Sequence, residues 1–474
     1  MEGTKYTTKQ AVLKRAQEII GIPLKLVDKT GRLATGKGAI GTVIEESWFE
    51  YSVNSESEPD FPEAGVELKV TPYIHGKSGE IRAKERLVCN IINYMEEYDK
   101  TFKTSSFWHK CATMLLMSYE HLSGVPKGEF KIDKAVLFNF PVEDLVIIEH
   151  DWQVIMDKVR RGEAHLISEG DTMYLAACTK GANSSSVRQQ PFSGIPAKQR
   201  AYSLKPSYMT QILNTYIFGN TQSERIIRDW RILSDTTFEQ YIETKLRPFY
   251  GKTIDELRSM LGVYSTAKNI VELLLAKMLG ASGKISSTEE FQKAGIVVKT
   301  VRLLPNGQAK ESMSFPTFDF KKIVAETWEE SALFETLSST KFMFVVFQSE
   351  YTDNPDEMVS SYSVAGGKLN QTAPSGVSGF KFSRIKFWNM PVEDLEEVRR
   401  VWQRTVDTIK QGVELRMQDG VVYNNLPKQS ENRIAHVRPH GKNAADKLPL
   451  PDGRMMTKQC FWLNRGYIAS ILRR

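Results

Sequence analysis

Three charged residues near the amino terminus have a spacing that suits chemistry on a phosphate group. Asp60, Glu67 and Lys69 lie within residues 60–69, which read DFPEAGVELK. Carboxylate oxygens are preferred ligands of Mg²⁺, and a nearby ammonium group stabilises the negative charge that develops when a phosphodiester is hydrolysed. The motif therefore predicts a metal-dependent nuclease site in which Asp60 and Glu67 hold the metal ion. A solvated charge pair on an edge strand fits the same short motif, so it needs support from elsewhere in the chain.

The residues around this motif predict the element that positions it. Glu67 and Lys69 are two positions apart, so on a β-strand their side chains point to the same face. Apolar residues alternate with them on the other face: Val66, Leu68 and Val70. Asp60 is expected at the start of the preceding strand, from which it could converge with Glu67 on one ion.

The motif recurs 230 positions later in an altered form. Residues 290–299 read EFQKAGIVVK, with Val297 at the position of Glu67 and Lys299 at that of Lys69. At the same offset Leu275 replaces Glu45, so both acids are lost together, which suggests that Glu45 also serves the site. Further matching blocks keep the same order along the chain, such as residues 139–145 (NFPVEDL) and 389–395 (NMPVEDL). Such repetition predicts a duplicated domain in which the first half carries the chemistry.

Each half shows the same succession of expected elements. Amphipathic helices are predicted at residues 7–20, 38–49, 237–248 and 267–280, and strands at residues 135–138 and 342–347. Pro141 and Pro391 each begin a further helix, with a Glu-Asp pair in its first turn. We expect an α/β fold with a mixed central sheet flanked by helices, present twice. The expected domains are residues 1–213 and 237–474, joined by a connector at residues 214–236.

The composition limits the classes of protein to consider. The chain has 474 residues and a net charge of +6, which fits an anionic partner without requiring one. Its four cysteines form no CxxC pair, which argues against a disulfide framework or a zinc knuckle. Since no apolar stretch reaches the ~20 residues of a membrane helix and the polar start lacks a signal-peptide core, we expect a cytoplasmic protein without membrane contact.

Two polar loops are candidates for contact with DNA. Residues 179–186 (TKGANSSS) are small and polar, and Lys180 and Asn183 could donate to base edges or phosphates. The matching loop of the second half is more basic. Its candidate contacts are Arg438, His440, Lys442 and Asn443.

Nearly the whole chain resembles the Sau-type GATC restriction endonucleases, which are relatives of the mismatch-repair nicking enzyme MutH. The resemblance is carried by residues 63–69 (EAGVELK), 84–88 (KERLV), 90–94 (NIINY), 104–107 (TSSF), 178–183 (CTKGAN) and 435–440 (AHVRPH). It implies a restriction-endonuclease-like fold in both halves, with the first half catalytic and the second a degenerate domain that binds DNA or acts allosterically.

The resemblance also implies an activity and residue roles. The family cuts double-stranded DNA 5′ of the guanine in GATC with Mg²⁺, as part of a restriction–modification system. Asp60, Glu67 and Lys69 match its metal-binding and water-activating residues, Glu45 matches a helix acid beside the metal, and Lys110 matches a further active-site lysine. The base-reading Arg-Pro pair of the MutH relatives falls on Cys178-Thr179 here.

Because GATC is palindromic and one half has lost its acids, we expect a chain that is monomeric when free and self-associates on DNA. A single chain that nicks the two strands in turn is the competing arrangement. Two other functions fit the residues: a mismatch-repair enzyme that nicks one strand, and a DNA-binding protein in which Asp60 and Glu67 are structural.

Overall fold

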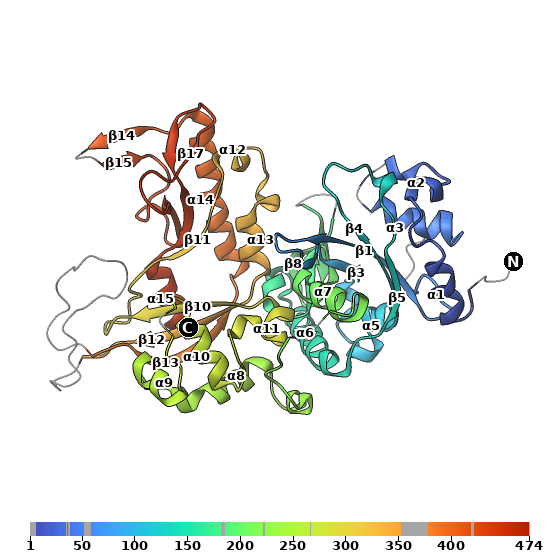
Figure 1. Ribbon diagram of the computed structural model, residues 1–474, viewed down its shortest axis with the longest axis horizontal. Coiled ribbons are helices and arrows are strands. Elements are labelled where there is room, and N and C mark those ends of the chain that lie inside the picture. Colours follow the sequence, from blue (N-terminus) through green and yellow to red (C-terminus); the bar gives the residue numbers. More distant parts are fainter. Residues whose placement is uncertain are drawn as a thin grey trace. The chain divides into compact units, whose positions relative to one another are not determined.

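The computed structural model describes residues 6–34, 36, 38–51, 58–181, 185–220, 223–265, 267–351, 378–418 and 421–473. The chain divides into two compact units, whose elements are labelled in Figure 1. The first unit contains Met1–Phe238 and Ser287–Gly295, and the second contains Glu239–Ser286 and Ile296–Arg474. Residues 214–236, the expected connector, are counted with the first unit.

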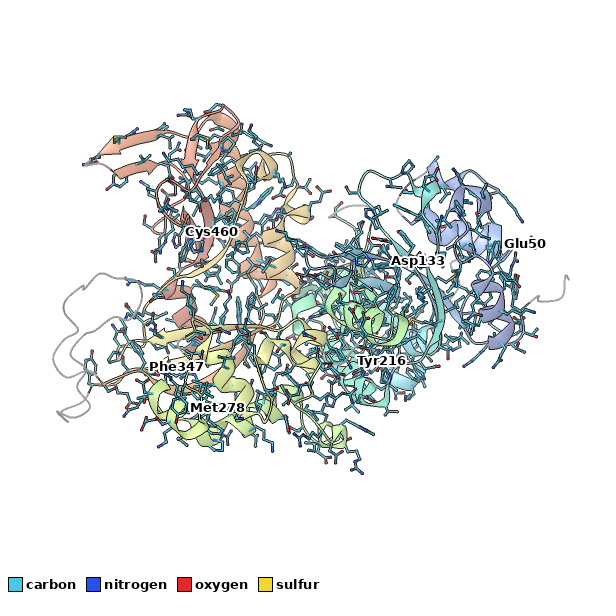
Figure 2. All side chains as sticks on the ribbon, in the orientation of Figure 1. Glu50, Asp133, Tyr216, Met278, Phe347 and Cys460 are labelled. Atoms are coloured by element: carbon cyan, nitrogen blue, oxygen red, sulfur yellow. The ribbon has the colours of Figure 1, made fainter. Side chains whose placement is uncertain are left out.

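A mixed four-stranded sheet lies at the centre of the first unit. Its order is β2-β1-β4-β5, in which β1 and β4 are parallel and the other neighbours antiparallel. The strands are β1 Glu67–His75, β2 Ile81–Ala83, β4 Met114–Glu120 and β5 Lys134–Phe138. Asp133, labelled in Figure 2, accepts hydrogen bonds from the Tyr73 hydroxyl at 3.0 Å and the Glu120 N–H at 2.9 Å. This carboxylate therefore links the carboxyl ends of β1 and β4.

Short helices at the amino terminus pack against this sheet. They are α1 Lys9–Gln17, α2 Leu24–Val27 and α3 Ala39–Val43, and α3 continues as a π-helix over Ile44–Trp48. The helix expected at residues 38–49 is therefore present but changes its winding halfway. The buried side chains of Val12 and Val43 join those of Phe61 and Leu115 in one apolar core. That core fixes the π-helix beside the start of β1.

The first unit also contains a second sheet and its longest helix. The sheet has the order β3-β9-β6 and a hairpin, β7-β8, lies next to it in the chain. Helix α6 begins after Pro141 with acids in its first turn, as the sequence predicted. The bounds are β3 Leu87–Ile91, α4 Tyr94–Glu97, α5 Ser106–Cys111, α6 Val142–Arg160, β6 Leu175–Thr179, β7 Val187–Gln190, β8 Ser193–Lys198, β9 Arg200–Leu204 and α7 Pro206–Ile212.

The second unit has two three-stranded sheets, with the orders β10-β12-β13 and β11-β19-β16. Strands β10 and β12 are parallel, and β12 and β13 are antiparallel. The strands are β10 Val297–Leu303, β11 Met313–Thr317, β12 Phe342–Gln348, β13 Lys381–Trp388, β14 Leu415–Gln418, β15 Val421–Asn424, β16 Ala435–Pro439, β17 Lys447–Pro449, β18 Met455–Thr457 and β19 Gln459–Leu463. The helices are α8 Phe238–Leu246, α9 Ile254–Leu261, α10 Ile270–Met278, α12 Phe320–Ile323, α13 Ala332–Ser339, α14 Val392–Gln411 and α15 Arg465–Arg473.

Helix α11, Glu289–Ala294, differs from the expectation drawn from the repeated motif. The motif predicted a strand with Glu290 at the position of Asp60, but Glu290 lies in a helix that is part of the first unit. Its carboxylate accepts hydrogen bonds from the backbone N–H groups of Ile226 and Ile227 at 2.8–3.1 Å. The buried Lys293 contacts both carboxylate oxygens of Asp144, at 2.7 and 2.9 Å. These contacts, rather than a strand, determine the position of Glu290.

All four cysteines are buried and unpaired. In the part of the chain that the structure describes, no helix combines the length and the apolar character that crossing a bilayer requires.

Candidate active site

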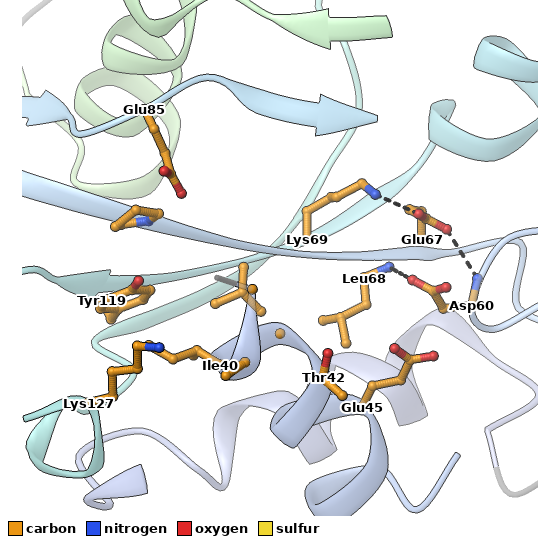
Figure 3. Close-up of a pocket in the computed structure, with 15 residues that line it drawn as sticks. Ile40, Thr42, Glu45, Asp60, Glu67, Leu68, Lys69, Glu85, Tyr119 and Lys127 are labelled. Atoms are coloured by element: carbon orange, nitrogen blue, oxygen red, sulfur yellow. Dashed lines mark hydrogen bonds and ion pairs between the residues drawn. The ribbon is translucent and has the colours of Figure 1, made fainter. Parts of the chain in front are cut away.

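A pocket of about 360 Å³ opens beside the first half of β1 (Figure 3). The α3 helix and the following π-helix form one side of it, and β1 forms the other. Its lining is rich in charged groups: Glu45, Asp60, Glu67, Glu85, Lys69 and Lys127. Four carboxylates against two ammonium groups give the pocket an excess of negative charge, which suits a cation.

Glu67 and Lys69 lie on the same face of β1, as the sequence predicted. The Lys69 Nζ donates to Glu67 Oε1 at 2.7 Å and to the carbonyl oxygen of Cys89 at 3.0 Å. Burial by itself would lower the pKa of Lys69, but the contact with Glu67 outweighs it and the net pKa is raised. Lys69 is therefore held as a cation at a fixed place in the pocket.

Asp60 is tied to β1 through the backbone. Its Oδ2 accepts a hydrogen bond from Leu68 N–H at 2.9 Å, and its own N–H donates to Glu67 Oε2 at 3.2 Å. We expected Asp60 at the start of a strand, but it does not begin one. It lies in a series of turns closed by an isolated bridge between Phe61 and Val66. The turns bring the Asp60 carboxylate alongside β1, so that it meets Glu67 without the predicted strand.

Glu45 reaches the same pocket from the π-helix. The pKa of its carboxyl is raised to about 7, first by burial and then by the charges of Asp60 and Glu67. Burial also raises the pKa of Glu67, which is 1% exposed. Three carboxylates thus repel one another in a space with limited access to water. A divalent cation among them would relieve that repulsion.

The donors fit a metal site that is only partly formed by protein. Across the described residues, no group of three or more His, Cys, Asp or Glu side chains is arranged to hold a metal ion. Asp60 and Glu67 nevertheless offer two carboxylates at one end of the pocket. Mg²⁺ is commonly bound by one or two carboxylates while water and substrate phosphate supply the other oxygens. The residues therefore fit this kind of site better than an all-protein cage.

Lys110, on α5, lies beside the pocket and approaches Glu67. Its Nζ lies 3.6 Å from Glu67 Oε2 and donates to the carbonyl oxygen of Glu58 at 3.2 Å. Ser105 caps α5, because its hydroxyl accepts from the Trp108 N–H at 3.1 Å and so fixes the first turn. The sequence did not point to Glu58, whose carboxylate contacts His109 at 2.8 Å. The structure thus brings together the five expected catalytic residues: Glu45, Asp60, Glu67, Lys69 and Lys110.

The pocket has three further charged or aromatic residues that the sequence argument did not assign to it: Glu85, Tyr119 and Lys127. Lys127 donates to the carbonyl oxygen of Gly36 at 2.6 Å, so its ammonium lies at the loop that precedes α3. Tyr119 and Lys127 come from segments that carry no motif of their own, and Glu85 lies in residues 84–88, to which no site role was assigned. Only the packing of the chain places them near Asp60.

Two DNA contacts were expected in the first unit, and the structure describes one of them, Lys180. Lys180 is exposed directly after β6, where its backbone N–H bonds to the Gln199 carbonyl at 2.8 Å. Asn183 lies outside the described residues. Lys180 therefore remains a candidate that is free to reach an external ligand.

Two of the four expected contacts in the second unit meet at one aromatic ring. The guanidinium of Arg438 lies 3.9 Å from the ring centre of Trp462, and the His440 ring is 5.1 Å away, edge to face. Both residues are exposed. Asn443 instead stabilises its own loop, since its Oδ1 accepts from Ala445 N–H at 2.9 Å. The Lys442 side chain is exposed.

The chain is similar to proteins of known activity. It is 37% identical to the "Type II restriction enzyme Sau3AI" of Staphylococcus aureus over 98% of both chains. It is 29% identical to the "DNA mismatch repair protein MutH" of Pectobacterium atrosepticum, over 43% of this chain and 90% of that protein. The MutH of Shewanella woodyi is 28% identical over 38% of this chain and 78% of its own length. The family model "DNA mismatch repair enzyme MutH" matches residues 49–151, which include Asp60, Glu67, Lys69 and Lys110.

Proposed function

The chain belongs to the family of type II restriction enzymes that includes Sau3AI, and we propose that it hydrolyses double-stranded DNA at 5′-GATC-3′, cutting 5′ of the guanine with Mg²⁺. It is thus a site-specific endonuclease. The observation that carries the proposed mechanism is the meeting of Asp60, Glu67 and Lys69 at one end of a negatively charged pocket.

Asp60 and Glu67 would hold the ion in this mechanism. When bound, Mg²⁺ would polarise a water molecule and neutralise charge on the scissile phosphate. Lys69, fixed by Glu67 and the Cys89 carbonyl, orients the attacking water and stabilises the developing negative charge. Glu45 can accept a proton from that water, since a pKa of about 7 leaves it partly ionised near neutral pH. Lys110 adds positive charge near Oε2 of Glu67, whereas Lys69 contacts Oε1.

The second half would be a degenerate copy of the first, produced by duplication. Matching side-chain contacts support this. The Tyr208 hydroxyl donates to Asp144 at 2.9 Å, and the Tyr467 hydroxyl donates to Asp394 at 2.8 Å. The sheet orders β3-β9-β6 and β11-β19-β16 also correspond in chain order and in strand direction. In this view residues 1–213 are the catalytic domain, 214–236 a connector, and 237–474 a DNA-binding or allosteric domain.

The chain would be monomeric when free and would self-associate on DNA. A palindromic site offers two equivalent scissile bonds, whereas the sequence keeps Glu45 and Glu67 in the first half and has Leu275 and Val297 in the second. Two chains would therefore each cut one strand. A rate that rises steeply with enzyme concentration, and faster cutting of plasmids with two GATC sites, is the expected result. A rate that depends linearly on concentration would favour one chain that nicks twice.

The activity is tested on a plasmid with a GATC site. The unaltered chain should linearise it in Mg²⁺ and leave ends cut 5′ of the guanine, and Asp60→Asn should not. EDTA should stop cutting. Glu63→Gln is the matched control, because Glu63 is an exposed acid in the same turns. Open-circle product alone would support a nicking repair enzyme, and specific binding without cutting would support a non-catalytic protein.

A further inference from the structure

The first strand of the β10-β12-β13 sheet reproduces the backbone frame that holds Lys69. Glu67 begins β1 and pairs with the first residue of β4, while its N–H bonds to the residue before β4 at 3.1 Å. Val297 begins β10 and pairs with the first residue of β12, and its N–H makes the same bond at 3.1 Å. Lys299 is therefore the third residue of its strand, as Lys69 is.

The acids that surround Lys69 have no equivalents around Lys299. The position of Glu67 is taken by Val297, which is 36% exposed, and that of Glu45 by the buried Leu275. Glu290, at the position of Asp60 in the repeated motif, is engaged with the backbone of Ile226 and Ile227. Among the described residues, the side chain of Lys299 has neither an ion-pair partner nor a hydrogen-bond partner.

Lys299 lines a pocket of about 180 Å³ whose other polar groups are mostly hydroxyls. The pocket includes Thr300, Ser312 and Ser314, whose hydroxyl groups can donate hydrogen bonds. Its one acid, Glu311, is paired with Arg302, so these two charges cancel. The pocket therefore has a net positive charge, carried by Lys299, where the pocket beside Lys69 is negative.

A partly buried ammonium group without an acidic partner is unfavourable unless an anionic ligand binds to it. Burial lowers the pKa of Lys299, because the ammonium loses hydration and gains no acid in return. An anion with several acceptor oxygens would restore the lost interactions and use the nearby hydroxyl groups. A phosphate has this chemistry and needs no metal here, since the one carboxylate of the pocket, Glu311, is already paired with Arg302.

We propose that the Lys299 pocket binds a phosphate of duplex DNA directly, without a metal ion. The inference rests on the proposed role of residues 237–474 as a DNA-binding domain, and it names the contact that this domain makes. The carboxylates that would hold Mg²⁺ in the first half have been lost in the second, while the lysine beside them has been kept and has become a ligand for the phosphate itself.

Binding is measured with the full chain in EDTA, by the fluorescence anisotropy of a labelled GATC duplex. Lys299→Met should weaken binding about tenfold, the effect of losing one hydrogen bond to a charged group. The slope of log affinity against log salt should fall in magnitude by about one. Lys299→Arg should retain most of the affinity. Lys410→Met is the matched control, because Lys410 is an exposed lysine of α14 in the same unit, and it should leave both quantities unchanged.

A second measurement uses the unaltered chain, so it does not depend on the folding of a variant. Acylation of Lys299 is followed by mass spectrometry in EDTA, with and without duplex. Protection by the duplex supports the proposal. Absence of protection, or protection by inorganic phosphate but not by the duplex, overturns it. If Lys299→Met binds like the unaltered chain while that chain still cuts GATC in Mg²⁺, the inference fails and the proposed function stands. If the unaltered chain does not cut, the proposed function fails.

Discussion

The starts of β1 and β10 present a lysine on the same backbone frame, but with opposite surroundings. Lys69 contacts Glu67 and lies in a pocket with Glu45 and Asp60. Lys299 faces a pocket whose single acid already has a partner. Backbone geometry therefore does not distinguish the proposed metal site from the proposed anion site. A few side chains that change the sign of the local charge do so.

Replacing each lysine in turn tests whether the two pockets differ in function. Lys69→Met should lower the rate of single-turnover cleavage by about 10²–10³-fold, because a fixed cation is lost where charge develops. Lys299→Met, assayed with saturating DNA, should change that rate by less than about tenfold, since it affects binding rather than the chemical step. Equal losses for the two variants would mean that the second pocket takes part in the reaction.

A second comparison concerns the aspartate at the start of each long helix. Asp144 is paired with Lys293, whose side chain is 5% exposed, and Asp394 with Arg433, whose side chain is 65% exposed. Lys293→Met should reduce the free energy of unfolding by about 3–5 kcal/mol, because a buried carboxylate loses its partner. Arg433→Met should cost less, about 1 kcal/mol, because the guanidinium is mostly exposed and the buried Asp394 keeps its hydrogen bond from Tyr467.

Urea denaturation of both variants, followed by circular dichroism, checks this difference. Lys293→Met exchanges an ammonium for an apolar side chain of similar length, so a cavity is not the cause of the loss. Similar midpoints for the two variants would contradict the dependence on burial.

The third comparison concerns Glu45 and Leu275, the residue at the corresponding position, and its expected effect on stability is the smallest. The folded-state pKa of Glu45, about 7, lies above its ordinary value of 4.5. The folded chain thus holds this proton more tightly than the unfolded chain, so stability falls as pH rises from about 4.5 to about 7. Glu45→Gln removes this penalty. In EDTA at pH 8 its Tm should exceed that of the unaltered chain by about 2 °C.

Thermal unfolding at pH 5 and pH 8 measures this effect, and the difference between the two chains should shrink at pH 5. Leu275→Met serves as the control, because it introduces no titrating group. A Tm advantage of Glu45→Gln that grew toward low pH would contradict the predicted direction of the pH dependence. Adding Mg²⁺ should reverse the order at pH 8, since the ion stabilises the ionised carboxylates.

The sequence predicted the parts of the site that depend on local periodicity. Alternation of apolar and charged residues identified β1 and placed Glu67 and Lys69 on one face. Asp60 was assigned correctly to the pocket but wrongly to a strand. Pro62 and Gly65 interrupt any strand here, and Gly65 has a φ of +61° that glycine adopts readily.

The sequence could not predict which distant residues contact the residues of the site. Lys69 donates to the carbonyl oxygen of Cys89, 20 positions away, and Lys110 reaches Glu67 from α5. Glu290 shows that a matching motif can also lead to a wrong structural prediction. Its motif matches that of Asp60, but hydrogen bonds to Ile226 and Ile227 stabilise a helical position in the first unit. No local pattern encodes a partner 64 positions distant.

By itself the sequence determined which charged groups are available: the acids and lysine of residues 60–69, the helix acid Glu45, and the apolar Leu275 and Val297 at the positions 230 residues after Glu45 and Glu67. It could do so because residue type and strand periodicity are local properties. The tertiary structure decided their electrostatic state. Burial raises the pKa of Glu45, the contact with Glu67 keeps Lys69 a cation against the effect of burial, and among the described residues no acid pairs with Lys299. Desolvation and charge pairing depend on every segment that packs around a group.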